Sequence, residues 1–102
     1  MSEWQVQIAP RAQSQIEEVT AWWRTTRPAA AKLVADELEA VVKRIASAPP
    51  SGMPYRRMEF RSVRRVLLPR IRYHAYYEVD EAKQLVRIVA FWHASRRSGP
   101  CL

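Results

Sequence analysis

The spacing of apolar residues changes at Pro49-Pro50, and this change constrains the fold more than any other feature of the chain. Before the two prolines, apolar residues recur every three or four positions over 10–26 and 29–48, which is the period of an amphipathic helix. After them, apolar and polar residues alternate over 70–79, which is the period of a half-buried strand. The chain is therefore expected to place two helices before most of its strands.

Prolines and short apolar runs mark the other boundaries. Pro10 and Pro28 are expected at the first positions of the helices, where a missing N–H costs nothing. A strand is expected at 4–8, and 51–62 is expected to be a loop. The later strands are expected at 63–68, 70–79 and 85–92, with a hairpin connection at 80–84. This order, β-α-α-β-β-β, predicts an α+β fold in which a helical hairpin packs on one face of a small, mostly antiparallel sheet.

The alternation over 70–79 also assigns side chains to the two faces of the sheet. The face that is expected to meet the helices carries Ile71, Tyr73, Ala75, Tyr77 and Val79. The opposite face carries Arg70, Arg72, His74 and Tyr76. Such a face makes a poor core and a good contact surface. The four tryptophans are expected to pack in or around the core rather than to bind ligands.

The excess positive charge is concentrated in the second half of the chain. The formal net charge is +7 and the isoelectric point is near 10.3. Residues 1–55 carry six basic and six acidic side chains, whereas 56–102 carry eleven basic and four acidic ones. Fourteen of the 17 basic residues are arginine, whose planar guanidinium group pairs well with phosphate and carboxylate. This half is therefore expected to bind nucleic acid or an acidic protein.

Length and composition exclude several classes of protein. A chain of 102 residues has room for one domain, which is expected to span 1–102 with 93–102 as a basic C-terminal tail. No apolar run is long enough to span a membrane, and no signal-peptide pattern is present. The single cysteine, Cys101, forms no disulfide framework, so a reducing cytoplasm is expected. The glycines are too few for a phosphate-binding loop and no metal-ligand spacing occurs, so neither a cofactor nor a metal is expected.

Metal-free RNA cleavage is harder to exclude than metal-dependent, hydrolytic-triad or phosphate-loop chemistry. Attack by a 2′-OH needs a base, an acid and cations that hold the phosphate. His74 offers a base with a pKa near neutrality, and Tyr76 offers a ring on which an RNA base can stack. The arginines available for a phosphate are Arg70, Arg72, Arg96 and Arg97. In the alternative interpretation, His74 is an ordinary polar residue on a solvated face and the arginines are surface charge.

Several motifs, taken in order and spacing, resemble the RelE/ParE superfamily of bacterial toxins from type II toxin–antitoxin modules. In the first half these are Ala9-Pro10-Arg11-Ala12, Ile16-Glu17-Glu18-Val19 and Ala21-Trp22-Trp23. In the second half they are Arg64-Arg65-Val66-Leu67, Arg72-Tyr73-His74-Ala75-Tyr76-Tyr77-Glu78-Val79-Asp80 and Trp92-His93-Ala94-Ser95-Arg96. The resemblance covers nearly the whole chain, and it implies the helical hairpin on a small antiparallel sheet that the residue pattern also predicts.

The superfamily divides into RelE-type toxins, which are ribosome-dependent mRNA interferases, and ParE-type toxins, which poison DNA gyrase. RelE-type toxins carry an Arg where this chain has His74, and a Tyr after the last strand where this chain has 98–102 without one. The stretch from Trp92 to Arg96 is similar to the ParE-type, plasmid-stabilisation branch. The resemblance therefore implies growth inhibition by binding gyrase rather than by catalysis. The alternative is a metal-independent endoribonuclease that uses His74, Arg72, Arg96 and Arg97.

Either branch implies a cognate antitoxin, which generally binds DNA and wraps the toxin with an acidic or amphipathic segment. The basic half of the chain complements such a partner, whose helix or strand is expected between the helical hairpin and the sheet edge. A third interpretation is a decayed or regulatory module that binds only the antitoxin. The residues expected to contact a target are Arg64, Arg65, Arg70, Arg72, His74, Tyr76, His93, Arg96 and Arg97.

Overall fold

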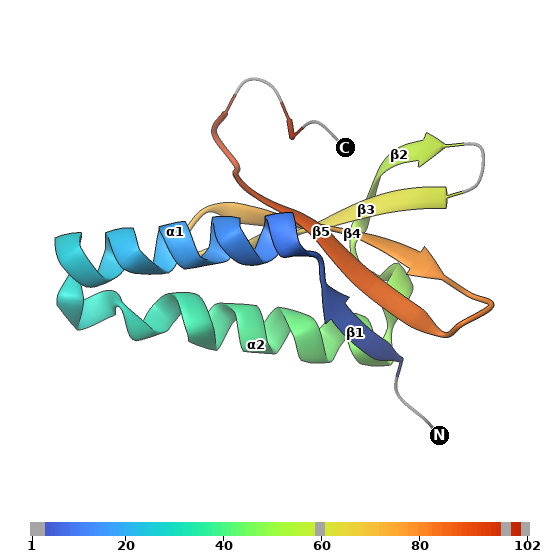
Figure 1. Ribbon diagram of the computed structural model, residues 1–102, viewed down its shortest axis with the longest axis horizontal. Coiled ribbons are helices and arrows are strands. Elements are labelled where there is room, and N and C mark those ends of the chain that lie inside the picture. Colours follow the sequence, from blue (N-terminus) through green and yellow to red (C-terminus); the bar gives the residue numbers. More distant parts are fainter. Residues whose placement is uncertain (1–3, 59–60, 97–98, 101–102) are drawn as a thin grey trace.

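The computed structural model describes residues 4–58, 61–96 and 99–100. Within them the chain forms five strands, two α-helices and two short 3-10 helices (Figure 1). In chain order these elements are β1 Gln5–Ile8, α1 Pro10–Thr26, η1 Pro28–Ala30, α2 Lys32–Ser47, η2 Pro49–Ser51, β2 Met53–Met58, β3 Arg61–Leu68, β4 Tyr73–Asp80 and β5 Leu85–His93.

The strands form one sheet, and both helices pack on the same face of it (Figure 1). The strand order is β1-β5-β4-β3-β2. β1 runs parallel to β5, and every other pair of neighbouring strands is antiparallel. The predicted α+β fold, with a helical hairpin on one face of a mostly antiparallel sheet, is confirmed.

Each helix buries the apolar stripe that its sequence predicts. The buried residues are Ala12, Ile16 and Val19 in α1 and Val34, Val41, Ile45 and Ala46 in α2. α1 has the predicted bounds, but α2 begins at Lys32 rather than at 29. The reason is a separate 3-10 turn at Pro28, in which the N–H of Ala31 donates to the carbonyl of Pro28 at 3.3 Å.

The predicted loop 51–62 contains an additional strand, β2, at the edge of the sheet. Pro54 does not prevent this strand, because an edge strand has one side that needs no partner. The pairing with β3 shifts between Pro54 and Arg56, which places a β-bulge at Tyr55. The sheet therefore has one strand more than the sequence analysis predicts.

β4 begins at Tyr73 rather than at 70, because the chain turns tightly after β3. The carboxylate of Glu37 in α2 accepts hydrogen bonds from the N–H groups of Arg70 and Ile71, both at 3.0 Å. Arg72 adopts a φ of 65°, in the left-handed region. Arg70 and Arg72 therefore lie in a turn, and the prediction that they share a sheet face with His74 is wrong.

A buried tyrosine joins the end of α2 to the sheet. The hydroxyl of Tyr77 donates to the carbonyl of Pro49 at 2.6 Å and accepts from the N–H of Gly52 at 2.8 Å. Gly52 has no room for a side chain, because a Cβ there would lie 2.5 Å from the same hydroxyl. These contacts fix the point at which the chain enters β2.

Three of the four tryptophans pack as predicted. Trp4 and Trp23 contact the core between the helices and the sheet, and Trp92 contacts a second cluster on the other face. Trp22 is 55% exposed and meets the ring of Trp23 edge to face, with ring centres 5.8 Å apart, so it lies at the edge of the helix and outside the core. Successive residues of a helix point about 100° apart, so Trp22 cannot share the inward direction of Trp23.

Candidate binding surface

The face of the sheet that the helices leave uncovered carries a row of aromatic and basic side chains. The strand pairing places Arg65 opposite Tyr76. It also places His74 opposite Trp92 on the neighbouring strand. We call this surface the helix-free face and define it by Tyr55, Arg65, Leu67, His74, Tyr76 and Trp92.

Tyr76 lies in a small second core beneath this face, so the prediction of an accessible ring is wrong. It is only 2% exposed and packs with Val63 and Ala90. The ring of Tyr55 meets it edge to face, with ring centres 4.8 Å apart. The physical reason is β2, which brings Tyr55 over the sheet from a segment expected to be a loop. Tyr76 therefore supports the face rather than offering a stacking platform.

Arginine side chains lie over the aromatic rings of this face. The guanidinium carbons of Arg65 and Arg56 are 5.4 and 6.0 Å from the centre of the Tyr55 ring. That of Arg96 is 4.3 Å from the centre of the Trp92 ring. Such cation–π contacts contribute about 0.5–1 kcal/mol at exposed sites. A guanidinium group held by its flat face presents N–H donors at its edge, in the geometry that binds carboxylates and phosphates.

His74 supplies the imidazole of the helix-free face. Its ring is half-buried, and its centre lies 6.0 Å from that of the Tyr76 ring. Burial lowers the pKa of His74, and the positive charge of Arg65 lowers it further. The imidazole is therefore mainly neutral near pH 7, with one nitrogen able to donate and the other to accept a hydrogen bond.

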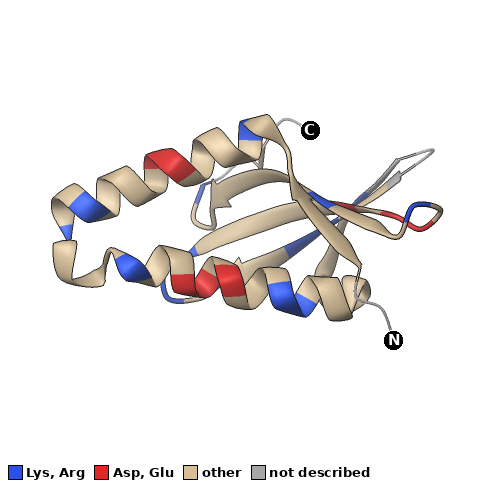
Figure 2. Cartoon of the chain, turned by 60° about the horizontal axis from the view of Figure 1, so that its bottom comes forward, with Lys and Arg blue, Asp and Glu red and all other residues tan. Residues whose placement is uncertain are grey.

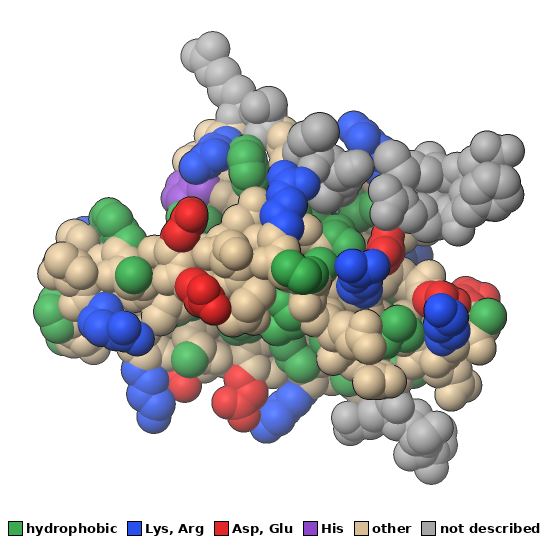
Figure 3. Space-filling view, in the orientation of Figure 1, with side chains coloured by type: hydrophobic (Ala, Val, Ile, Leu, Met, Phe, Trp, Pro, Cys, Tyr) green, Lys and Arg blue, Asp and Glu red, His purple; other side chains and the backbone are tan. Residues whose placement is uncertain are grey.

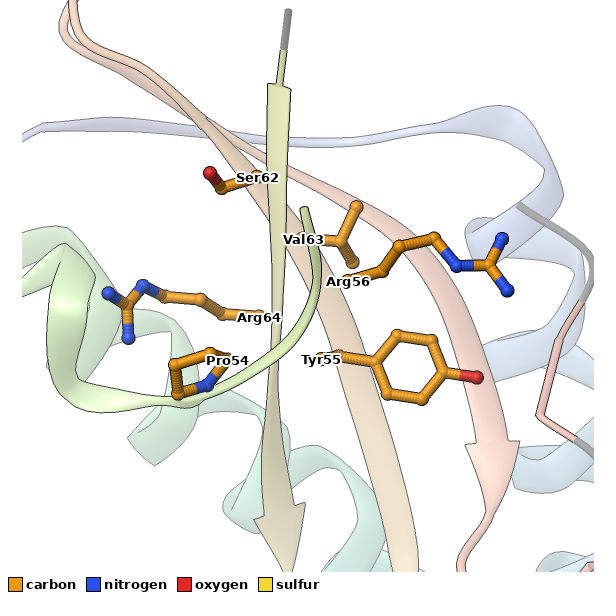
Figure 4. A pocket seen from close by; sticks show the side chains of 6 residues that line it. All are labelled: Pro54, Tyr55, Arg56, Ser62, Val63 and Arg64. Carbon is orange, nitrogen blue, oxygen red and sulfur yellow. The ribbon is translucent and has the colours of Figure 1, made fainter. Parts of the chain in front are cut away.

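Arg64, although it adjoins Arg65, points to the other side of the sheet. Its Nη1 donates to the carbonyls of Gly52 and Pro50, at 2.8 and 3.2 Å. Figure 4 shows the difference at the pocket between β2 and β3, where Tyr55 points to one side of β3 and Arg64 to the other. Arg64 therefore holds the entry to β2 in place and does not belong to the helix-free face.

His93 is also separated from His74. Its ring lies on the helix side of the sheet, with its centre 5.0 Å from that of the Tyr73 ring. Its Nδ1 accepts a hydrogen bond from the N–H of Ser95 at 3.1 Å and lies 2.6 Å from the Ser95 hydroxyl. The two histidines therefore face opposite sides of the sheet and cannot act on one substrate atom.

The other predicted contact residues are divided between the face and its surroundings. Arg65 and Arg96 lie over rings of the helix-free face. Arg70 and Arg72 are exposed in the turn between β3 and β4. Arg97 lies outside the described residues.

The sequence analysis missed Tyr55, which the structure places at the centre of the arginine contacts. Its neighbour Pro54 and the small number of apolar residues in 51–62 favour a loop. The available signal was the run of one aromatic and two basic residues, Tyr55-Arg56-Arg57, directly after the proline. A bulge at this point turns the Tyr55 side chain toward the helix-free face.

The charge on the helices differs from the charge on the central strands. Acidic and basic residues alternate along α1 and α2, whereas β3 carries basic residues and no acidic one (Figure 2). Figure 3 shows the same mixture of signs over the surface that the helices form. Neither helix in the described part of the chain has the length and apolar character of a membrane span. No three potential metal ligands among His, Cys, Asp and Glu come together within the described residues.

Solved structures share this fold. The structure described as the chromosomal ParDE toxin–antitoxin system from P. aeruginosa aligns with a TM-score of 0.72 at 14% identity, covering 91% of this chain and 98% of that one. The archaeal RelE–RelB complex from Pyrococcus horikoshii OT3 aligns with a TM-score of 0.66 at 11% identity, covering 92% and 98%. The isolated E. coli RelE toxin aligns with a TM-score of 0.61 at 17% identity, covering 93% and 88%.

A family model, and not an individual curated protein, identifies the family of this chain. A search of curated proteins finds no match. The model of the family described as the ParE toxin of the type II toxin–antitoxin system, parDE, matches residues 6–98. This range includes both helices, β2 to β5, all of β1 except Gln5, and every residue of the helix-free face. The chain therefore belongs to the ParE family of toxins from type II toxin–antitoxin systems.

Proposed function

We propose that this toxin inhibits bacterial growth by binding and poisoning DNA gyrase through its helix-free face. The observation that carries the proposal is the pair of guanidinium groups held over the ring of Tyr55, those of Arg65 and Arg56. Groups held in this way fit protein carboxylates and DNA phosphates, and a gyrase–DNA complex presents both. The resemblance to ParE-type toxins, which poison DNA gyrase, supports the same target.

The arrangement of titratable groups favours binding over catalysis. Metal-free RNA cleavage needs an acid and a base within hydrogen-bond reach of one phosphodiester. The nearest carboxylate on the same side of β4 is Glu78, four residues from His74 and therefore about 13 Å away along the strand. His93 lies on the other side of the sheet. The described residues of the helix-free face thus offer one imidazole without a second acid or base beside it.

A cognate antitoxin is the second partner that we propose, acting with the toxin in the cytoplasm. The family description places such toxins in type II toxin–antitoxin systems, and similar structures include a ParDE system and a RelE–RelB complex. The net charge of +7 suits an acidic partner. We expect the toxin-wrapping segment of the antitoxin to lie along the boundary between the helical hairpin and the sheet edge.

A ribosome-dependent mRNA interferase is the second candidate function, and one observation favours it. His74 lies among arginines and aromatic rings, and its lowered pKa leaves the imidazole free to accept a proton near pH 7. In this candidate His74 acts as the base, and Arg72, Arg96 and Arg97 hold the phosphate.

Inducible expression in a bacterium separates the two candidates. We would follow growth, the DNA damage response and mRNA integrity in the same cultures, for the unmodified protein and for His74→Ala. Gyrase poisoning predicts growth arrest with filamentation, an induced damage response and intact messages. Codon-phased mRNA cleavage that His74→Ala abolishes would replace the gyrase proposal with the interferase. Expression without growth arrest would contradict both and favour a module that binds only the antitoxin.

A further inference from the structure

The segment that follows β5 contacts the sheet at two places, of which the first is the end of β5 itself. The N–H of Ala94 donates to the carbonyl of Arg72 at 2.8 Å, and the N–H of Arg96 donates to the carbonyl of His93 at 3.2 Å. These bonds bend the chain at the end of β5 and place Arg96 over the indole of Trp92.

The same segment meets the sheet again at its opposite edge. Gly99 lies so close to the ring of Tyr55 that an added Cβ would collide with the phenolic oxygen. The next residue, Pro100, is buried. Tyr55 is in β2 and Trp92 is in β5, with β4 and β3 between them. We call the described residues of this segment, 94–96 and 99–100, the strap.

The strap covers the groups that the helix-free face would offer to a target. Its first anchor, Arg96, lies over one face of the Trp92 ring. Its second anchor, Gly99, lies against the hydroxyl end of Tyr55, the ring over which Arg65 and Arg56 also lie. The two rings lie on strands that are three strand spacings apart, about 14 Å. While both anchors are in place, Arg96 occupies one face of the Trp92 ring and Gly99 occupies the space at the hydroxyl end of Tyr55.

We propose that the strap is an autoinhibitory contact, in which the chain's own segment occupies the helix-free face and lifts when a target binds. The inference rests on the proposed function, because it assigns to that face the contact with the target. Arg96, Ser95 and Gly99 are exposed, and a surface contact of this size opens far more easily than the whole fold. A strap closed in about nine molecules of ten lowers the apparent affinity for the target about tenfold.

Gly99 provides a substitution that should release the strap while the residues that carry the two rings stay unchanged. In Gly99→Val, the added side chain collides with Tyr55, which is itself held between Tyr76 and Arg65. A compensating pair, Gly99→Ala with Tyr55→Phe, removes the phenolic oxygen, and the next atom, the ring carbon Cζ, lies 3.1 Å from the new Cβ. Ala82→Val, in the exposed turn between β4 and β5, controls for an added apolar side chain.

Two structural measurements test the strap independently of any target. The first is the nuclear Overhauser effect between the Gly99 Hα protons and the Tyr55 ring protons in the full chain. The second is the rate of Tyr55 nitration by tetranitromethane, followed by mass spectrometry.

We expect the Overhauser effect in the unmodified protein and in Ala82→Val, and its loss in Gly99→Val. Nitration should be several-fold faster in Gly99→Val, and the Overhauser effect should return between residue 99 and the ring in the compensating pair. Absence of the effect in the unmodified protein would overturn the strap.

Inhibition of purified gyrase tests the regulation. If the strap competes with gyrase, Gly99→Val should inhibit supercoiling at about a tenth of the concentration that the unmodified protein needs. Equal inhibition by both, with the strap released in the variant, would overturn the autoinhibition. If the structural measurements succeed and neither protein inhibits gyrase, the gyrase proposal fails while the strap stands. Release should then be tested on translating ribosomes, where faster mRNA cleavage by Gly99→Val would support autoinhibition and an unchanged rate would overturn it.

Discussion

Arg65 lies over the ring of Tyr55, with its guanidinium carbon 5.4 Å from the ring centre. The contact joins β3 to β2 on the helix-free face, above the buried ring of Tyr76. Arg64, one residue earlier, points to the other side and donates to backbone carbonyls instead. The two adjacent arginines of β3 therefore differ in role: Arg65 lies on the helix-free face, and Arg64 stabilises the fold.

Removal of the Arg64 side chain should lower stability more than removal of its neighbour. Arg64→Ala loses two hydrogen bonds from a charged donor to the carbonyls of Pro50 and Gly52, at a cost of about 1–2 kcal/mol. Arg65→Ala loses a cation–π contact that contributes about 0.5–1 kcal/mol. Urea denaturation of both variants measures the difference. A larger loss of stability for Arg65→Ala than for Arg64→Ala would contradict the structural role of Arg64.

Tyr77→Phe should destabilise the fold by about 2 kcal/mol or more. The hydroxyl that is lost both donates to Pro49 and accepts from Gly52, so two buried backbone groups lose their partner. Each such group costs about 1–3 kcal/mol when left unsatisfied. Thermal and chemical denaturation would measure the loss, with Tyr55→Phe, whose ring is only half-buried, as the matched control. A loss no larger than that of the control would contradict the role of Tyr77.

Gly52→Ala should also destabilise the fold, and its effect should be coupled to that of Tyr77→Phe. The new Cβ would lie 2.5 Å from the Tyr77 hydroxyl and 2.9 Å from the Arg65 carbonyl oxygen, and such overpacking costs about 1–3 kcal/mol. Because one clash involves the hydroxyl itself, the double variant should lose less stability than the sum of the single losses. A double-mutant cycle measures this coupling, and strict additivity would contradict it.

The pH dependence of stability should contain a contribution from His74. Burial and the charge of Arg65 lower its pKa in the folded protein below the ordinary 6.5, so between these two values the unfolded chain binds more protons. The stabilising contribution is therefore complete above pH 6.5 and is lost as the pH falls toward the lowered value. Unmodified protein should lose more stability between pH 7 and pH 5 than His74→Gln, as urea denaturation at both values would show. Equal losses of stability in the unmodified protein and in His74→Gln would contradict a lowered pKa of His74 in the folded protein.

Local patterns predicted the parts of the fold that depend on them. Pro10 and the period of apolar residues predicted α1 with an end near Thr26, and alternation placed Tyr73, Ala75 and Tyr77 on the face that meets the helices. The family resemblance extended the prediction to nearly the whole chain, and the ParE family model confirms the family over residues 6–98.

The remaining features depend on contacts between residues far apart in sequence. β2 forms because it pairs with β3, and its bulge turns Tyr55 over Tyr76, which local pattern could not predict. The turn that removes Arg70 and Arg72 from the sheet depends on a carboxylate of α2, Glu37. The alternation of side chains along 63–68 already indicates that Arg64 and Arg65 point to opposite faces of the sheet. The prediction that both arginines contact a target did not take this alternation into account.

The most direct test of the central claim is supercoiling by purified gyrase in the presence of this toxin, with Arg65→Ala and Arg64→Ala compared at equal folded concentration. We expect the unmodified protein and Arg64→Ala to inhibit supercoiling and to accumulate cleaved DNA, and Arg65→Ala to need about tenfold more protein, the equivalent of about 1.4 kcal/mol of binding energy. Undisturbed supercoiling with a micromolar excess of folded, unmodified toxin would contradict gyrase as the target. Equal inhibition by Arg65→Ala and the unmodified protein would contradict the helix-free face as the contact surface.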